Sequence, residues 1–175
     1  PMILSVSRRT DIPAFYMPWF MNRLREGYVM VRNPMNYHQV SRVSLSPEVI
    51  DCMVFWTKNA MPLTPHLGEI ALQYPFYIQY TLNPYGRDLE PGLPPLAQRL
   101  ASACAIAEQF GSKHVVWRYD PIMLTEQYTA DWHIEQFAAM ADALKGSARD
   151  CVFSFVDLYD TVSYTHLRAH ETGAY

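Results

Sequence analysis

Between residues 115 and 121 the chain reads Val115-Val116-Trp117-Arg118-Tyr119-Asp120-Pro121. A short run of β-branched and aromatic residues, typical of a buried strand, ends here in an arginine and an aspartate. Arg118 and Asp120 alternate around Tyr119, so in a strand they point to the same face and can contact each other. Three other apolar runs end in the same way, at Ser7-Arg8-Arg9-Thr10-Asp11, at Thr57-Lys58-Asn59 and at Thr81-Leu82-Asn83-Pro84.

This pattern has a chemical interpretation, because an unpaired charge at the end of a buried strand costs free energy. In parallel α/β sheets and barrels, the carboxyl ends of the strands form the edge where ligands bind and reactions take place. The pattern therefore predicts a parallel α/β fold with a functional site along that edge.

Strand and helix signals alternate along the chain, and no internal repeat is present. Strands are expected at residues 3–7, 28–32, 52–57, 76–82, 114–117 and 151–156, with a short exposed strand at 39–45. Helices are expected at 14–26, in the second half of 61–73, at 96–110 and after Thr129, with a further helix start at Ser46-Pro47-Glu48. Residues 83–95, rich in proline and glycine, are expected to form an irregular loop of a length usually reserved for function.

Strands separated by helices of this size favour right-handed βαβ units and a parallel sheet. About six such units make either an incomplete TIM-type barrel or an open parallel sheet, since a complete barrel usually needs roughly 250 residues. We therefore expect a single α/β domain, a partial barrel, over residues 1–161 of the 175-residue chain.

Composition narrows the class of protein. Half of the residues are hydrophobic and 18% are charged, which is typical of a globular protein. No apolar run reaches the roughly 18–20 residues that cross a bilayer, and no signal peptide is recognisable, so a cytoplasmic protein is expected. The net charge of −3 disfavours non-specific nucleic-acid binding. Cys52, Cys104 and Cys151 have no metal or disulfide spacing and are expected to be buried free thiols.

The last segment of the chain differs from the rest. Residues 164–172, Tyr-Thr-His-Leu-Arg-Ala-His-Glu-Thr, resemble translated sequencing adapter, an artefact of assembled metagenomic reading frames. His166 and His170 do not form a zinc motif, because that motif needs a glutamate directly after the first histidine. We expect residues 162–175 to be a disordered, non-native tail, with the native chain starting at Met2 and cut near Asp160.

Several strings in the chain resemble one bacterial family, called domain of unknown function 1848, in order and spacing over residues 2 to about 160. They are the string from Met2 to Tyr16, Val31-Arg32-Asn33-Pro34, Val54-Phe55-Trp56-Thr57-Lys58-Asn59, Tyr80-Thr81-Leu82-Asn83-Pro84-Tyr85-Gly86, Trp117-Arg118-Tyr119-Asp120-Pro121 and Ser154-Phe155-Val156-Asp157-Leu158-Tyr159.

Members of that family carry, toward their C-terminus, a cysteine cluster similar to the C-x-x-x-C-x-x-C motif of radical S-adenosylmethionine enzymes. Their barrel-like part resembles that of spore photoproduct lyase. The resemblance implies a [4Fe–4S] cluster and S-adenosylmethionine in the full-length parent. The segment that would carry those cysteines is absent here, so we expect no cofactor in this fragment and no radical activity from it.

Three carboxylates at the expected edge are candidates for catalysis, namely Asp11, Asp120 and Asp157. Eight further residues are candidates for holding a cofactor or an anionic substrate, namely Arg8, Arg9, Thr10, Lys58, Asn59, Thr81, Asn83 and Arg118. No residue is a candidate metal ligand.

The candidates also have structural interpretations. Asp11 can form a salt bridge and begin a helix, Asn83 before proline is a common turn residue, and Arg118 with Asp120 can be a buried ion pair. The four tryptophans are interpreted as core or barrel packing.

Three classes of function remain open from the sequence. The first is the N-terminal part of a radical S-adenosylmethionine-like barrel of unknown substrate. The second is a cluster-independent hydrolase or isomerase that uses edge carboxylates as acid or base. The third is a non-catalytic protein that binds an anion. A small or anionic partner is expected, nucleic acid enters only by family analogy, and the truncated sheet is expected to self-associate.

Overall fold

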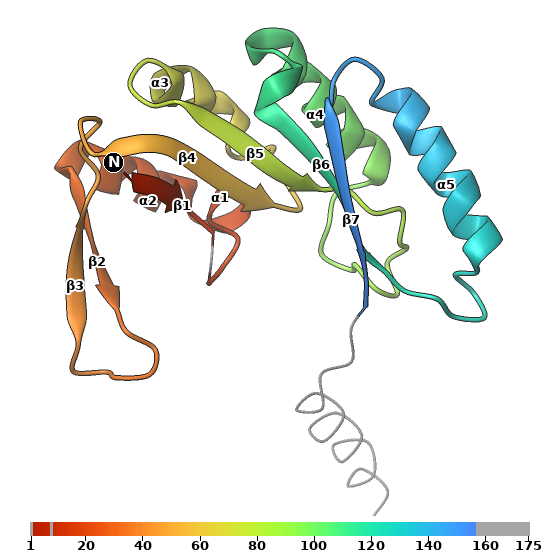
Figure 1. The fold of residues 1–175 in the computed structure, drawn as a ribbon, viewed down its shortest axis with the longest axis horizontal. Coiled ribbons are helices and arrows are strands. Elements are labelled where there is room, and N and C mark those ends of the chain that lie inside the picture. Colours follow the sequence, from red (N-terminus) through yellow and green to blue (C-terminus); the bar gives the residue numbers. More distant parts are fainter. Residues whose placement is uncertain (1, 8, 157–175) are drawn as a thin grey trace, which may run out of the picture.

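The computed structural model describes residues 2–7 and 9–156, which form a five-stranded sheet, a separate hairpin and flanking helices (Figure 1). The strands are β1 (Met2–Ser5), β2 (Tyr28–Arg32), β3 (Val40–Ser44), β4 (Ile50–Thr57), β5 (Phe76–Thr81), β6 (Val115–Ile122) and β7 (Asp150–Phe155). The α-helices are α1 (Ile12–Phe15), α2 (Met17–Glu26), α3 (Leu67–Ala71), α4 (Leu96–Phe110) and α5 (Ala130–Ala143). Two short 3₁₀ helices, Thr64–His66 and Ser112–His114, complete the set.

The large sheet has the order β1-β4-β5-β6-β7, and every neighbouring pair is parallel. The predicted α/β fold with a parallel sheet is confirmed. Among the described residues the sheet is open, with β1 and β7 as its two edges. All five carboxyl ends therefore lie along one edge of the sheet, as the sequence pattern predicts.

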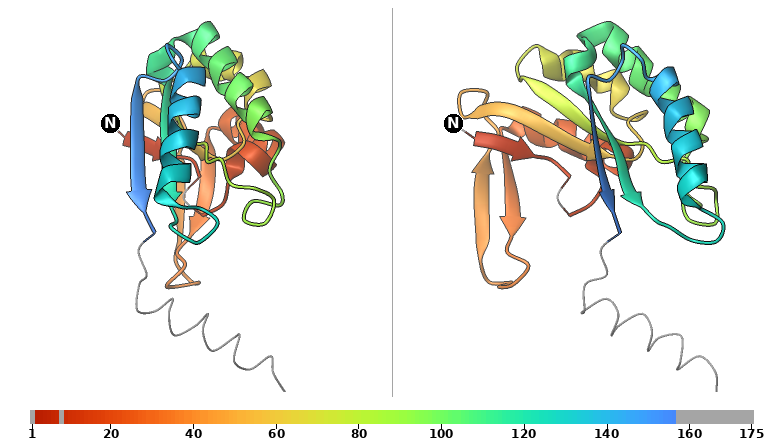
Figure 2. Two further views of the ribbon diagram at one scale, coloured as in Figure 1. Left: turned by 90° about the vertical axis from the view of Figure 1, so that its right-hand side faces the viewer. Right: turned by 45° about the vertical axis from the view of Figure 1, so that its right-hand side comes forward.

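The helices cover one face of the sheet (Figure 2). Phe20 of α2 packs edge-to-face on Phe55, Phe76 packs on Phe110 of α4, and Trp117 stacks on Phe137 of α5. In β5 the residues on this face are buried and the alternate ones are only partly buried, which is the period of two expected for a strand. Trp56, Thr81, Arg118 and Asp120 belong to the alternate set, so they lie on the face that the described helices leave uncovered.

Residues 28–32 do not join the parallel sheet, so it has five strands rather than about six. They pair antiparallel with β3 and form a hairpin that projects from the body of the molecule (Figure 1). Only seven residues separate β2 from β3, too few for the crossover that a parallel pair needs. The short strand expected at 39–45 is confirmed as β3.

The predicted helix starts hold in part. Thr129 caps α5 by accepting a hydrogen bond from the Trp132 N–H at 3.2 Å, as expected. The helix start predicted at Ser46-Pro47-Glu48 is wrong, because these residues form a turn that leads directly into β4. The single helix expected at 14–26 is two helices, since Pro18 lacks the N–H that would bond to the carbonyl of Ala14.

Some burial predictions also need correction. On α5 and at its C-cap the apolar residues at 134, 137, 141 and 144 have the spacing of a buried face, yet Ile134 is 68% exposed. The neighbouring His133 is buried instead, since its imidazole hydrogen-bonds to the hydroxyl of buried Tyr119. Trp117 is buried as predicted, whereas Trp19 and Trp56 are 46% and 38% exposed. The cysteines are free thiols, but none is fully buried, and Cys151 is exposed because it lies on the edge strand β7. No helix among the described residues has the length and apolar character needed to cross a membrane.

Candidate functional site

Asp11 ties the end of β1 to the end of β4. Its Oδ1 accepts from the Ala14 N–H at 3.0 Å and so caps α1, while its Oδ2 accepts from the Thr57 hydroxyl at 2.9 Å. The same Oδ2 accepts from the backbone N–H of Lys58 at 3.0 Å. Both carboxylate oxygens are therefore held by protein donors, and Asp11 positions the start of the edge rather than facing a ligand.

Lys58 continues this edge into a buried ion-pair group. Its Nζ lies 2.6 Å from Oε1 of Glu90, a residue of the β5–α4 loop whose side chain is 6% exposed. On the other side of Glu90, a guanidinium nitrogen of Arg99 lies 3.6 Å from Oε2. Arg99, on α4, also donates to the carbonyls of Pro94 and Asn83. The Lys58 side chain keeps 44% of its surface exposed, so Lys58 is the accessible residue of the group.

Arg118 and Asp120 form a second group at the end of β6. The Arg118 Nε donates to Oδ2 of Asp120 at 3.1 Å, and a terminal nitrogen of the guanidinium contacts the same oxygen. Oδ1 of Asp120 accepts from the hydroxyl of Ser154 on β7. The guanidinium carbon lies 4.8 Å from the centre of the Trp56 ring, which reaches over from β4. The contacts of this group thus span three strands on the uncovered face.

Asn83 connects β5 to the second group through the backbone. Its Nδ2 donates to the carbonyl of Asp120 at 2.8 Å, and its Oδ1 accepts from the N–H of Asp120 at 3.0 Å. The asparagine is 1% exposed, so this pairing is shielded from water. Asn83 therefore fixes the backbone that carries the Asp120 carboxylate.

Electrostatics keep Asp120 ionised. Burial alone would raise the pKa of its carboxyl, but hydrogen bonds from Ser154 and Arg118 and the positive charges of Arg118 and Lys58 outweigh burial and lower the pKa. The Lys58 ammonium is therefore close enough to act on Asp120 as well as on Glu90. The edge presents the Lys58 and Arg118 cations beside the ionised Asp120 carboxylate, with Lys58 also paired to the buried carboxylate of Glu90.

The structure brings together Asp11, Lys58, Asn83, Arg118 and Asp120 along the carboxyl edge. Thr81 lies beside Arg118 in the sheet register, on the same uncovered face. The Asn59 side chain accepts from the Met61 N–H at 3.1 Å and stabilises the loop after β4.

Two predicted site residues lie apart from this edge group, and two others fall outside the described residues. Arg9 and Thr10 line a separate pocket beside the β2–β3 hairpin. Arg8 and Asp157 lie outside the described residues, so their assignment stays a prediction.

Sequence reasoning missed Glu90, Arg99 and Ser154. The sequence could have indicated Arg99, because this residue lies on the apolar face of the predicted helix 96–110, where an arginine needs a buried partner. Glu90 had only its place in the loop of functional length, and Ser154 had none. Trp56 was interpreted as packing, although it holds the Arg118 guanidinium in place.

The residues present do not fit a [4Fe–4S] cluster. Three thiolates in one place are needed to hold three irons. Cys52 lies near the start of β4, Cys104 lies on α4 and Cys151 lies at the start of β7, all away from the carboxyl edge. Within residues 2–7 and 9–156, no three side chains of His, Cys, Asp or Glu come together as a metal site. The described edge can instead bind an organic ligand by charge and hydrogen bonds.

The comparisons agree with the motif resemblance. A family model described as Domain of unknown function (DUF1848) matches residues 3–173. Searches of the curated proteins and of the solved structures each found no match. Because the match spans nearly the whole chain, the protein belongs to the DUF1848 family.

Proposed function

We propose that this chain forms the ligand-binding part of a radical S-adenosylmethionine-like protein, and that its carboxyl edge binds the charged amino-acid end of that molecule. The observation that supports the proposal is the placement of Arg118 and Asp120 on the uncovered face at the carboxyl edge, with the Lys58 charge near enough to lower the pKa of Asp120. The iron–sulfur ligands implied by the resemblance would come from outside residues 2–156.

Arg118 is suited to hold a carboxylate. A guanidinium has five N–H donors, and here Nε and one terminal nitrogen point to Asp120. Within residues 2–7 and 9–156 the remaining donors have no partner and can take a ligand oxygen, and stacking on Trp56 holds the plane of the guanidinium before any ligand arrives. A pre-positioned group loses less entropy on binding, which favours affinity.

Lys58 adds a second cation to the same edge. An ammonium has three donors, and one contact to Glu90 leaves others for a ligand. Glu90 is itself held by Arg99, so the carboxylate that contacts the ammonium is fixed in place, while the Lys58 side chain remains 44% exposed. Two cations next to one carboxylate match a zwitterion, because the ligand carboxylate meets Lys58 and Arg118 while its ammonium meets Asp120.

S-adenosylmethionine carries such a zwitterionic end. It supplies radical chemistry only together with a reduced iron–sulfur cluster, which this edge does not hold. The role of the described residues is therefore to bind and orient the methionine portion. Asp120 serves as an ionised acceptor in this arrangement: Oδ2 accepts from Arg118 and Oδ1 from Ser154, and the ligand ammonium would use a remaining lone pair on the partly exposed carboxylate.

The acid–base alternative has less support from the geometry. Asp11 is engaged by three protein donors, and the lowered pKa of Asp120 makes it a poor proton donor near neutral pH. A binding protein for simple anions is the second candidate, because Lys58 and Arg118 would serve it equally well. The two candidates differ in whether the ligand ammonium contributes.

The test is calorimetric titration of the full chain with S-adenosylmethionine. We expect Arg118→Gln and Lys58→Met each to weaken binding about tenfold, the scale of one charge-assisted hydrogen bond. Arg25→Gln is the matched control, because Arg25 forms an exposed pair with Glu69 far from the edge. Circular dichroism at the titration temperature checks that each variant is folded.

Three further ligands separate the candidates. Methionine should retain measurable binding and 5′-methylthioadenosine should lose it, because only the first carries the zwitterion. Inorganic phosphate that binds as well as S-adenosylmethionine would support the anion-binding candidate. Absence of S-adenosylmethionine binding, or equal affinity in both edge variants, would contradict the proposal.

A further inference from the structure

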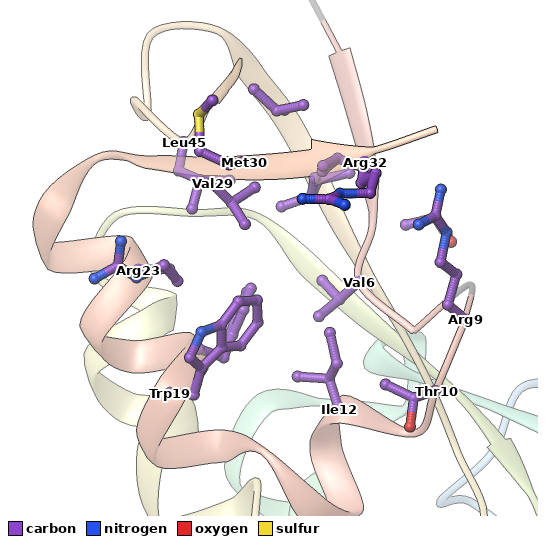
Figure 3. Close-up of a pocket in the computed structure, with 15 residues that line it drawn as sticks. Val6, Arg9, Thr10, Ile12, Trp19, Arg23, Val29, Met30, Arg32 and Leu45 are labelled. Atoms are coloured by element: carbon purple, nitrogen blue, oxygen red, sulfur yellow. The ribbon is translucent and has the colours of Figure 1, made fainter. Parts of the chain in front are cut away.

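A pocket lies beside β1, away from the carboxyl edge that carries Lys58 and Arg118. It has a volume of about 360 Å³ and is enclosed by the end of β1, by α2 and by the β2–β3 hairpin (Figure 3). This volume is within the roughly 300–1,000 Å³ of small-molecule sites. Two strands, β4 and β5, separate β1 from β6 in the sheet, so this pocket and the Arg118 group are distinct places.

The floor and walls of the pocket are apolar. Val6, Ile12, Val29 and Leu45 line it, together with Trp19, whose indole projects toward the hairpin (Figure 3). Trp19 is 46% exposed and lines the pocket, so part of its apolar surface is available to a ligand. An apolar or aromatic ligand body would cover this surface and gain hydrophobic free energy.

Three arginines line the same pocket. Arg9 and Arg32 lie together at one end, and Arg23 lies on the opposite side, on α2 (Figure 3). No carboxylate of the described residues lies within ion-pair distance of any of these three guanidiniums. The Nε of Arg23 is buried and has no hydrogen-bond partner within residues 2–7 and 9–156.

Arg9 and Arg32 are exposed and lie together, so they offer guanidinium donors at the open end of an apolar pocket. A carboxylate or phosphate accepts from a guanidinium in a bidentate manner, and the unpartnered Nε of Arg23 adds one buried donor on the opposite side. Arg9 and Arg32 converge from different segments, the β1–α1 loop and the end of β2, so one anionic group can contact both. The pocket therefore combines a candidate anion site at one end with an apolar surface beside it.

We propose that this pocket binds an organic anion with a flat apolar body, its phosphate or carboxylate held by Arg9 and Arg32 and its body packed on Trp19. The proposal is independent of S-adenosylmethionine binding at the carboxyl edge, because the two sites share no residue. It assigns to the hairpin a role in ligand binding, since Arg32, Val29 and Met30 come from β2.

The experiment titrates the full chain with 1-naphthyl phosphate, 1-naphthoate, 1-naphthol and inorganic phosphate, followed by calorimetry. We expect at least one of the two naphthyl anions to bind. 1-Naphthol and phosphate should bind at least about tenfold more weakly, since 1-naphthol lacks the anionic group and phosphate lacks the apolar body. The tighter of the two anions identifies the chemical class. Equal binding of 1-naphthol, or no binding of either anion, would overturn the proposal.

Variants locate the probe. Arg32→Gln and Trp19→Ala should each weaken binding of the better naphthyl anion about tenfold. Arg42→Gln and Phe15→Ala are the matched controls. Arg42 lies on β3, the partner strand of β2, and Phe15 lies on α1, the helix before α2; both residues are exposed and neither lines the pocket. Loss of binding in Arg118→Gln with retention in Arg32→Gln would place the probe at the carboxyl edge and overturn the assignment.

Discussion

The side-chain amide of Asn83 pairs with both backbone groups of Asp120, at 2.8 Å to the carbonyl and 3.0 Å from the N–H. This two-bond pairing imitates a strand neighbour beyond the last residue of β5. It supplies partners for backbone groups that would otherwise end the ladder unpaired. The carboxylate of Asp120 is therefore held in place by a residue that takes no direct part in its charge interactions.

Replacing Asn83 should destabilise the fold. Asn83→Ala removes both bonds and leaves a buried N–H and a buried carbonyl without partners, so we expect the free energy of unfolding to fall by about 2–3 kcal/mol. Urea denaturation followed by circular dichroism measures this change. Asn22→Ala, at an exposed position of α2, is the control and should change stability by less than about 0.5 kcal/mol. A loss of similar size in both variants would contradict the structural role of Asn83.

The lowered pKa of Asp120 predicts a pH dependence of stability. A carboxyl whose pKa is lower in the folded than in the unfolded state stabilises the fold while it is ionised. The difference in unfolding free energy between wild type and Asp120→Asn should therefore be constant above about pH 5 and shrink as the pH falls below about 4. Urea titrations at pH 7, 5, 4 and 3 measure the difference, and an unchanged gap at pH 3 would contradict the ion pair with Arg118.

The buried pair of Glu90 and Arg99 should be costly to break from one side. Glu90→Gln leaves the Arg99 guanidinium, 2% exposed, without its counter-charge, and we expect a loss of about 3–5 kcal/mol. The double variant Glu90→Gln, Arg99→Met should recover part of this loss, because the uncompensated charge is removed. Chemical denaturation of the two single variants and the double variant gives the coupling energy.

A surface pair in the same protein provides the comparison. Arg25 and Glu69 are 3.4 Å apart, with side chains 63% and 49% exposed. Glu69→Gln should change stability by less than about 1 kcal/mol, because water screens both charges. If Glu90→Gln were as mild as Glu69→Gln, the Lys58 group would be a solvated surface network rather than a buried one.

The open edge of the sheet should promote self-association. Phe153 and Phe155 on β7 are 61% and 59% exposed, and Ile3 on β1 is 68% exposed. Exposed apolar edge strands offer unpaired backbone groups and hydrophobic surface to a second chain. We expect the sedimentation coefficient to rise with protein concentration, and Phe153→Lys with Phe155→Lys to reduce that rise. A monomer at about 100 μM would show the prediction to be wrong.

Local pattern predicted most of the elements. The apolar stripe of residues 96–110 and the glycine that follows it, Gly111, predict a helix with the bounds that the structure has. The pattern also predicts the strand at 28–32, but it does not predict the partner of that strand. The alternation of apolar residues indicates that a segment is extended, whereas it carries no information about which strand it pairs with. The helix start predicted at Ser46 is wrong because strand β4 begins only four residues later, at Ile50, which is 3% exposed in the core.

The candidate site shows the same division. The polar cluster after each strand was visible in the sequence, and the parallel sheet brings Lys58, Asn83 and Arg118 to one edge. Glu90 and Ser154 became visible only in three dimensions, because a loop and an edge strand reach the site from far along the chain. The position of Arg9 after β1 predicts that it belongs to the carboxyl edge, whereas in the structure it lines the pocket beside the β2–β3 hairpin.

By itself, the sequence determined the class of fold, the family and the edge at which charged residues gather, since these depend on residue types and spacing along the chain. The tertiary structure alone decided which charges pair, that Asp11 is held by Thr57 and Lys58, and that the arginines divide between two places. The physical reason is that local propensity acts over a few residues, whereas ion pairs and pockets depend on which distant segments pack together. Chain topology sets those neighbours, and their burial determines what each charge can do.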